Sequence, residues 1–550
     1  MKYLRWLAKA VRPYRGAMAV MMICHLFIAC CAVGFVYVSK QLVDVAVAMF
    51  EGRQSGMGIW PWAAAMICIV LLRILLNALR TYLQTKTDIR LKNALRHRIF
   101  DILLHSEENV AARHHSGDVL NRMQEDVRVV SNALAVSLPN LFGTALQFIA
   151  AFAFLLMLDL RLALLIAVVV PAGILAGKFI TARIRNLTLD IRKSDSKVQS
   201  HVQESIQHLT LLQSLEYADT SSSELQGLQD NLYGNELRRT RFNIVSRIFI
   251  SLAFSAGHAI AFIWGVFGIS TGTVTYGMMT AFLQLVGQIQ RPLVEMSSQI
   301  PSLIHATASI DRLIELETLP REDFSEPILL GGTAGIRLSD VCFAYPDSEK
   351  DVLHGFSHDF RPGSRTAITG PTGVGKSTLI RLLLTLLKPQ SGSMEIYTAG
   401  SGPHGEESFA LTPAMRCNMV YVPQGNTLFS GTIRDNLLMG NPDADDLQLE
   451  SVLRTAAADF VFDLPLGLDT QCFEAGGGLS EGQAQRIAIA RALLRPGSVL
   501  LLDEFSSALD ARTEIMLMER LTARLPEHTM IFITHRDRII DYCDSVLRMQ

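Results

Sequence analysis

The chain has 550 residues, of which 49% are hydrophobic and 19% are charged, and its formal net charge is -2 at pH 7. A single hydrophobic core stops growing at roughly 250 to 300 residues, so we expect at least two folding units. The composition is too apolar for a wholly soluble protein and too charged for a wholly embedded one, and the near-zero net charge excludes a global attraction to nucleic acid.

The chain begins with a basic, amphipathic segment, residues 1–15, in which Lys9 and Arg12 alternate with Trp6 and Leu7. This mixture is typical of a short elbow helix that lies in the inner membrane interface, and a plain cytosolic leader is the alternative. Six apolar windows of about 20 residues follow, which is the length needed to cross the hydrocarbon core of a bilayer. They lie at about 16–38, 57–79, 137–158, 161–181, 248–269 and 274–296. Basic residues precede the first window, so the positive-inside rule predicts that both termini are cytosolic.

Two long connections separate these windows on the inner side, at about 80–136 and 182–247. Both have helical periodicity and contain no proline. Two helical legs of about 25 residues would reach on the order of 40 Å into the cytosol. We expect turns at their tips near 107–113 and 208–214, a transmembrane domain over 16–315, and a Pro- and Gly-containing linker over 316–334.

From residue 335 to residue 550, short β-branched strands alternate with helical stretches, which predicts an α/β domain with a largely parallel sheet. Its first strand-turn-helix unit contains GPTGVGKST, the pattern of a phosphate-binding P-loop with a helix that begins at Lys376. The glycines let backbone amides close around a β-phosphate, Lys376 bridges the β and γ oxygens, and Ser377 offers its hydroxyl to magnesium. The residues assigned to the nucleotide are Gly370, Pro371, Thr372, Gly373, Val374, Gly375, Lys376, Ser377 and Thr378.

A second motif, SVLLLDEFSSALD, starts with an apolar run that predicts a central parallel strand buried on both faces. Its carboxyl end carries Asp503 and Glu504, and ligands of parallel sheets bind at this edge. We expect Asp503 to hold the magnesium shell and Glu504 to polarise the attacking water. Paired acids after a strand can also cap a helix, an alternative that the upstream P-loop disfavours.

Together these features resemble an ATP-binding cassette (ABC) exporter half-transporter, and the resemblance covers nearly the whole chain. It identifies GGLSEGQAQRIAIARALL, residues 477–494, with the family's signature motif, although Glu481 stands where glycine is commoner. It implies that Ser480, Gly482 and Gln483 contact nucleotide.

The same resemblance identifies Gln424 in YVPQ as the Q-loop residue, with a role in catalysis and at the metal, and His535 in IFITHR as the switch histidine. It identifies Tyr345 in FAYP as the aromatic residue that stacks on adenine, and SALD as the D-loop. Taken singly, Tyr345 could pack within its own sheet, Gln424 could be a loop amide and His535 a helix cap. Their joint occurrence in the family's order favours the nucleotide site.

The resemblance implies a multidomain membrane protein, with a six-helix transmembrane domain of ABC exporter type, long cytosolic helical extensions and an α/β P-loop nucleotide-binding domain. ATP and Mg²⁺ are the implied cofactors. Because the signature of one cassette faces the P-loop of another, one chain needs a partner; intact catalytic positions favour a homodimer over a heterodimer.

The implied function is ATP-driven export or flipping of a hydrophobic or amphipathic substrate, such as a lipid, drug or peptide-like molecule, across the cytoplasmic membrane by alternating access. An ATP-gated channel or receptor on the same scaffold is the alternative. Polar residues inside spans are costly and often functional, so five of them are candidates for a cavity lining, although snorkelling or helix-helix hydrogen bonds would also explain them. They are His25, Arg73, Gln147, His258 and Gln284.

Overall fold

The computed structural model describes residues 2–52, 58–108, 116–322, 326–345, 351–398, 407–473 and 478–549, except the side chains of 2–4, 116, 169–185 and 297–298. The chain divides into two compact units. The first comprises Met1–Ile99 and Val119–Glu315, and the second comprises Phe100–Asp118 and Leu316–Gln550. Most of the predicted tip 107–113 lies outside the described residues.

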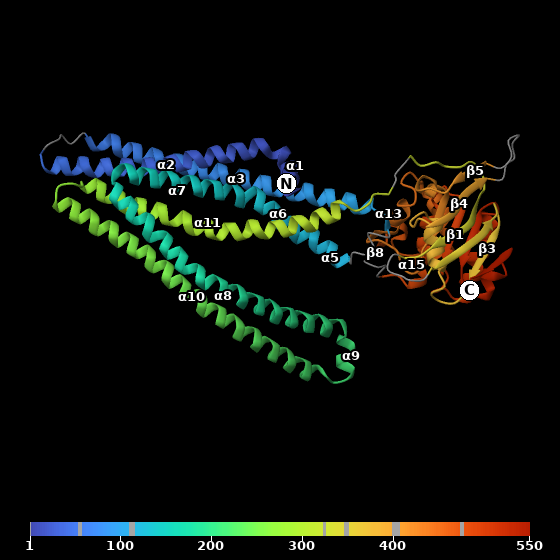
Figure 1. Ribbon diagram of the computed structural model, residues 1–550. Helices are drawn as coiled ribbons and strands as arrows, with labels where there is room; N and C mark the ends of the chain where they lie inside the picture. The colour runs from blue at the N-terminus through green and yellow to red at the C-terminus, as the bar shows by residue number, and fades with distance from the viewer. Residues whose placement is uncertain are drawn as a thin grey trace. The chain divides into compact units, whose positions relative to one another are not determined.

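The first unit is built from long helices, several of which pass through more than one predicted segment (Figure 1). The helices of the N-terminal half are α1 (Lys2–Val11), α2 (Arg15–Phe50), α3 (Ile59–Leu104), α5 (Ser116–Asn121), α6 (Val127–Asn132) and α7 (Leu138–Leu158). They are followed by α8 (Leu160–Gln207), α9 (Leu209–Ser214), α10 (Ala218–Ser270) and α11 (Tyr276–Glu317). The short helix α9 occupies the predicted second tip, between the antiparallel helices α8 and α10 that lie side by side in Figure 1.

A polar contact fixes the start of α8 next to α10. Asp159 caps α8 by accepting hydrogen bonds from the backbone amides of Arg161 and Leu162, at 2.9 and 3.0 Å. Its second oxygen accepts a 2.9 Å bond from the indole of Trp264 in α10. Buried residues such as Phe282 pack nearby in an apolar core shared by α2, α7, α8, α10 and α11. The cap therefore satisfies a helix terminus inside an otherwise apolar environment.

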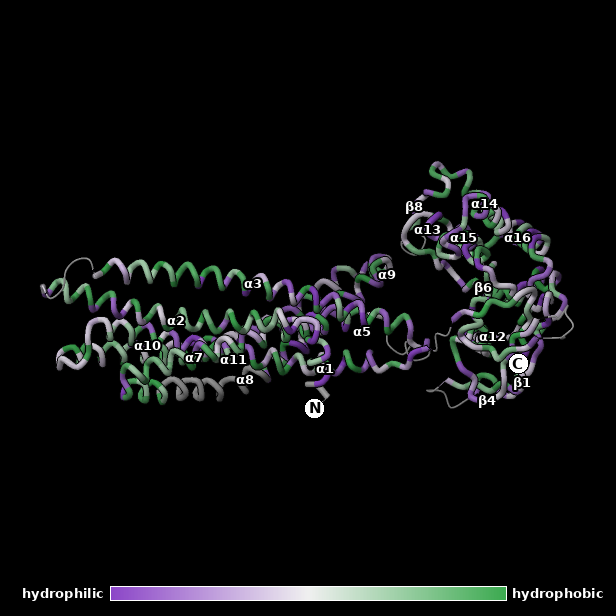
Figure 2. Tube along the Cα trace, turned by 90° about the horizontal axis from the view of Figure 1, so that it is seen from above, coloured by the Kyte–Doolittle hydropathy of each residue, from purple (hydrophilic) through white to green (hydrophobic). Residues whose placement is uncertain are grey.

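Hydrophobic residues recur along the helices of the first unit (Figure 2), and many of their side chains are exposed. On α3, Ile67, Leu71 and Leu75 are each more than 60% exposed. Within the described residues, four helical stretches are long and apolar enough to cross a membrane: Arg5–Phe50, Ile59–Leu104, Gly117–Leu158 and Ala218–Ser270. The windows predicted at 161–181 and 274–296 fall in α8 and α11, and many side chains of the former lie outside the described part.

The second unit contains a parallel sheet at the centre of an α/β fold. Its five strands run in the order β11-β3-β10-β9-β6 and all pair in parallel. They are β3 (Arg365–Thr369), β6 (Met419–Val422), β9 (Val499–Asp503), β10 (Thr529–Ile533) and β11 (Ser545–Arg548). Every residue of β9 is buried: β10 and β6 flank its edges, and its apolar side chains alternate between two cores, with Leu500 and Leu502 in one and Val499 and Leu501 in the other. This confirms the predicted central strand.

A second sheet was not predicted from the sequence. It is antiparallel, with the order β2-β1-β4-β5, and consists of β1 (Ala334–Phe343), β2 (Leu353–Phe360), β4 (Ser391–Thr398) and β5 (Glu407–Ala410). A short ribbon pairs β7 (Gly431–Thr432) with β8 (Gln471–Cys472). The helices include α12 (Lys376–Leu383), α13 (Ile433–Leu438), α14 (Asp446–Thr455), α15 (Glu481–Leu493), α16 (Ala511–Arg524) and α17 (Asp537–Ile540).

The second unit also contains the end of α3 and the residues that follow it. The backbone amide of Glu107 donates to the carbonyl of Pro320 at 3.1 Å, and that of Glu322 donates to the carbonyl of His105 at 2.9 Å. The Glu107 carboxylate accepts a 2.6 Å charged hydrogen bond from Lys388. The first lever tip and the linker therefore pair with each other beside the helix that follows the P-loop.

Candidate nucleotide-binding site

The P-loop connects β3 to α12, which begins at Lys376 as predicted. Gly375 caps this helix with φ +103°, a conformation that favours glycine, and a β-carbon there would lie 2.7 Å from Val352. The Lys376 ammonium donates to the carbonyls of Gly370 and Pro371 at 2.6 and 3.1 Å. The lysine is therefore held across its own loop, where phosphate oxygens can replace the two carbonyls as acceptors.

Three side chains from different loops meet beyond the ends of the parallel strands. The amide of Gln424, after β6, donates a 2.6 Å hydrogen bond to Oε2 of Glu504, after β9. The other carboxylate oxygen, Oε1, lies 3.7 Å from Nε2 of His535, after β10. The structure thus brings together the three residues assigned to catalysis.

The backbone of Glu504 has φ +44°, which is unusual for a residue with a side chain. Two hydrogen bonds hold the Glu504 backbone. Its backbone amide donates to the carbonyl of Ile533 at 3.0 Å, and its backbone carbonyl accepts from the side-chain amide of Gln485 at 3.4 Å. Strained backbone that neighbours enforce is typical of functional sites. Here the positive φ angle sets the direction in which the Glu504 side chain points after the end of β9.

Asp503 ends β9 and is only 7% exposed. Burial raises the pKa of Asp503 to about 6, and the negative charge of Glu504 acts in the same direction, whereas Lys376 opposes it. The described residues contain no group of three or more His, Cys, Asp or Glu side chains placed to hold a metal. The assigned metal residues Ser377, Gln424 and Asp503 instead offer a hydroxyl, an amide and a carboxylate, oxygen donors of the kind that Mg²⁺ prefers when phosphates supply its other ligands.

Tyr345, assigned to adenine stacking, lies just after β1 and contacts the P-loop helix. Its hydroxyl is 3.2 Å from the hydroxyl of Thr378, and its ring meets the ring of Phe343 edge-on with centroids 5.1 Å apart. The tyrosine is therefore beside the P-loop, and its stacking on a base stays a prediction.

The signature residues start α15. Ser480 is its N-cap: the Ser480 hydroxyl accepts from the amide of Gln483 at 3.2 Å, and the Gln483 side chain accepts from the amide of Ser480 at 2.9 Å. A β-carbon on Gly482 would lie 2.7 Å from the carbonyl of Ala508 in the D-loop, so this position requires glycine. The capping box leaves the helix start well formed in a single chain.

Comparison with known families agrees with this geometry. The model described as "ABC transporter transmembrane region" matches residues 18–293, half of the chain, and the model described as "ABC transporter" matches residues 353–507. The chain belongs to the ABC transporter family.

Relatives of this ABC transporter include the Bacillus subtilis protein YgaD, named as a multidrug export ATP-binding/permease protein, which is 27% identical over 86% of this chain and 81% of its own length. A protein of the same description from Staphylococcus aureus strain NCTC 8325 is 28% identical over 88% of this chain and 83% of its own length. Among solved structures, a bacterial Atm1-family ABC exporter with ATP bound has the same fold, with a TM-score of 0.79, 23% identity, and coverage of 98% of this chain and 93% of that one.

Arginines that the sequence analysis missed connect the loops of the ABC transporter's nucleotide site. Arg536 follows the switch histidine and donates to the D-loop carbonyls of Ser507 and Leu509 at 2.9 and 3.1 Å. Arg491 in α15 donates to the carbonyl of Thr427 at 2.9 Å, three residues after Gln424. The position of Arg536 directly after the motif histidine was a signal that could have identified it.

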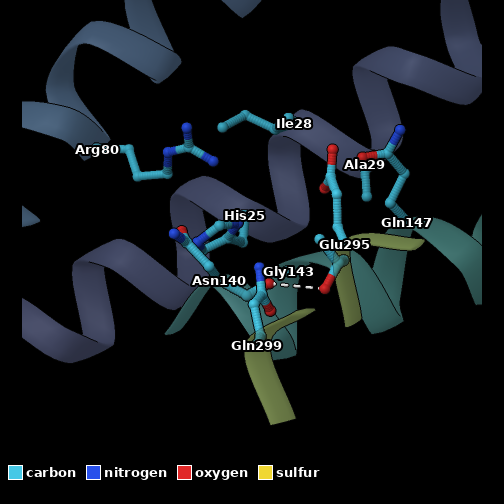
Figure 3. Close-up of a pocket in the computed structure, with 10 residues that line it drawn as sticks. His25, Ile28, Ala29, Arg80, Asn140, Gly143, Gln147, Glu295 and Gln299 are labelled. Carbon is cyan, nitrogen blue, oxygen red and sulfur yellow. Dashed lines mark hydrogen bonds between the residues drawn. The ribbon is translucent and has the colours of Figure 1, made fainter. Parts of the chain in front are cut away.

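The polar candidates within the helices of the transporter divide into two groups. His25 and Gln147 line one cavity (Figure 3). Gln284 donates to the hydroxyl of Ser39 at 3.0 Å, His258 lies 3.0 Å from the carbonyl of Phe254 one turn earlier, and Arg73 is exposed on α3. None of these three lines that cavity.

Proposed function

We propose that the protein hydrolyses ATP and uses the energy to export or flip a hydrophobic or amphipathic substrate across the cytoplasmic membrane. The observation that carries this proposal is the placement of Glu504 between Gln424 and His535, in a chain that also contains long apolar helices. The relatives named as multidrug export proteins support the same direction of transport.

The catalytic roles follow from the atoms present. Lys376 and the amides at the start of α12 would bind the phosphates, and Ser377, Gln424 and Asp503 would hold Mg²⁺, which neutralises phosphate charge when it is bound. Glu504 would accept a hydrogen bond from the attacking water, and His535, whose Nε2 lies 3.7 Å from the same carboxylate, would donate to an oxygen of the γ-phosphate. Displacement of Gln424 from the Glu504 carboxylate frees that oxygen for the water.

Two copies of the chain would form the working unit. Ser480, Gly482 and Gln483 lie at the start of α15, whose positive helix end suits the γ-phosphate bound by a second chain. Closing the two cassettes on ATP then favours one state of the membrane domains. A shift from 1:99 to 99:1 needs about 5.5 kcal/mol of differential binding, which two γ-phosphates contacted only in the closed state can supply.

The lever tips provide the mechanical connection in this proposal. Glu107 bonds to Lys388, and Glu108 lies 3.7 Å from Arg381 of α12, so the first tip contacts the helix that follows the P-loop. Movement of the cassette would therefore be transmitted to α3. The termini and both cassettes would lie in the cytosol.

Reconstitution into vesicles tests the proposal. Vesicles with outward-facing cassettes should hydrolyse Mg-ATP and accumulate a fluorescent amphipathic cargo against its gradient, whereas Glu504→Gln vesicles should do neither. Cross-links between residue 480 of one chain and residue 373 of the other should increase with ATP. Flux only down a gradient, with ATP present, would support the channel alternative; absence of ATP hydrolysis would contradict the export proposal.

A further inference from the structure

A polar cavity lies inside the helical unit, between α2, α3, α7 and α11 (Figure 3). Its volume is about 290 Å³. The lining consists of His25, Ile28, Ala29, Arg80, Asn140, Gly143, Thr144, Gln147, Glu295 and Gln299. All of these residues belong to the first unit.

The cavity holds a positive charge that its one acid only partly balances. Among the described residues, the Arg80 guanidinium makes no ion pair and no side-chain hydrogen bond, and its buried Nε lacks an acceptor. The one acid in the lining, Glu295, acts on Arg80 through its charge but also pairs with Arg291 at 3.3 Å. One carboxylate therefore serves two arginines, and the positive charge that is left over would attract an anion to Arg80.

A second orphaned polar atom lies next to this charge. His25 is 5% exposed, and its Nε2 has no hydrogen-bond partner in the part of the chain that the structure describes. Its ring lies so close to α7 that a β-carbon on Gly143 would be 1.9 Å from its Nδ1. A buried polar atom left unsatisfied costs roughly 1–3 kcal/mol, which a ligand oxygen would recover. Gly143 thus positions a buried imidazole toward the same space as Arg80.

The location and size of the cavity limit what can occupy it. By the predicted spans, Arg80 and Glu295 lie at the cytosolic ends of the second and sixth spans, and His25 lies in the inner half of the first. Ligand sites for whole drug-sized molecules are about 300–1,000 Å³, so this cavity suits a polar head group. The apolar part of the same molecule would extend along the lipid-facing helices.

We propose that this cavity binds the anionic head group, a carboxylate or a phosphate, of an amphipathic substrate. Arg80 is the ionic anchor, and His25, Gln147 and Gln299 supply hydrogen bonds. The role of this cavity in transport rests on the proposed export function, whereas the binding of an anionic head group does not. The sequence alone suggested a hydrophobic or amphipathic cargo, and this cavity adds a charge requirement to it.

Equilibrium dialysis tests the charge requirement on nucleotide-free protein in lipid nanodiscs, with protein-free nanodiscs as the blank. Four radiolabelled probes share one alkyl chain: dodecyl phosphate, dodecanoate, dodecyltrimethylammonium and dodecyl maltoside. We expect one or both anions to bind at least tenfold more tightly than the cationic and neutral probes, and the two anions distinguish a phosphate site from a carboxylate site. Equal binding of the cationic probe would overturn the proposal without any variant.

Variants locate the site. Arg80→Gln should weaken anion binding by roughly ten- to a hundredfold, the effect of losing a charged hydrogen bond, whereas Arg80→Lys should retain most of it. Gly143→Ala should weaken it by displacing the His25 ring. Arg73→Gln, seven residues earlier on the same helix and outside the cavity, is the matched control and should bind like the wild type. Unchanged affinity in Arg80→Gln would refute the assignment, whereas intact anion binding without ATP-driven transport would refute only the export function.

Discussion

The side-chain amide of Gln424 and the carboxylate of Glu504 are joined by a 2.6 Å hydrogen bond, although 80 residues separate them in the chain. This bond occupies one oxygen of the carboxylate that we propose orients the attacking water. In the proposed mechanism, Gln424 leaves this oxygen when it binds the metal, so the oxygen becomes free to accept from the water. The Q-loop would then be coupled directly to the catalytic step.

Replacing Glu504 by Gln should leave ATP binding intact and lower ATP turnover by at least about a hundredfold, because an amide cannot polarise water as a carboxylate does. The Gln424 amide can still donate to the new side-chain oxygen, so the local structure should persist. Binding of a fluorescent ATP analogue and phosphate release measure the two effects separately. Normal phosphate release from this variant would show that another residue is the base.

Replacing Lys376 by Ala should reduce nucleotide affinity itself. The ammonium is the charged donor nearest the loop carbonyls, and losing a charged hydrogen bond costs roughly 1.5–3 kcal/mol, or about ten- to a hundredfold in affinity. Lys388→Ala, a change of the same kind at an exposed lysine, should bind nucleotide normally. Equal affinities of the two variants would contradict the phosphate-binding role.

Local sequence patterns predicted the individual strands and helices of this fold better than they predicted which strands pair with each other. The run VLLLD indicated a strand buried on both faces, and β9 has every residue buried. The antiparallel sheet was missed because β2 reads LHGFSHDF, where Gly355, Ser357 and His358 weaken any apolar alternation. Register shifts interrupt its pairing with β1 after Leu338 and again after Val341.

The candidate sites show the same limit: a continuous motif could be predicted from the sequence, but the meeting of distant residues could not. The P-loop is one continuous segment, so its chemistry could be read from nine residues. The approach of Gln424 and His535 to Glu504 follows from strand order, which spacing alone does not encode, and it was expected only through the family resemblance. Arg80 and Glu295 were not predicted to share a cavity, because each span was considered separately.

Replacing Gly482 by Ala should abolish ATP turnover with little effect on folding of the rest of the chain. The new methyl group would meet the backbone carbonyl of Ala508 at 2.7 Å, which cannot move without displacing the D-loop. Overpacking of this kind costs roughly 1–3 kcal/mol. Gly227→Ala, on α10 with open space at its β-carbon, is the control and should be fully active. Wild-type turnover in Gly482→Ala would show that this close contact is unimportant.

Exchanging the charges of Glu107 and Lys388 should show whether this contact couples cargo binding to ATP hydrolysis. The pair is partly exposed, with side-chain exposures of 27% and 64%, so its direct stabilisation is below about 1 kcal/mol. Glu107→Lys should reduce the stimulation of ATP hydrolysis by cargo, and the double variant Glu107→Lys, Lys388→Glu should restore it. A double variant no better than the single one would argue against this contact in coupling.

Acid should destabilise the nucleotide-binding part through His358. Burial lowers the pKa of His358 below its usual 6.5, and its buried Nε2 finds no hydrogen-bond partner among the described residues. Below pH 6.5 the unfolded chain therefore takes up the proton more readily than the folded one, so this contribution to stability is present at pH 7.5 and declines as pH falls. His358→Phe, between the rings of Phe356 and Phe360, should lose less thermal stability between pH 7.5 and 5.5 than the wild type. An identical loss in both proteins would contradict the effect.

The mutual hydrogen bonds of Ser480 and Gln483 have a consequence for the end of each cycle. In the proposed dimer, engaging a phosphate from the opposite subunit would exchange one set of partners for another, and releasing it would return both groups to bonds that the lone cassette already supplies. Separation after phosphate departure would then leave this helix start capped. The proposed interface could open repeatedly, because neither half would need refolding once apart.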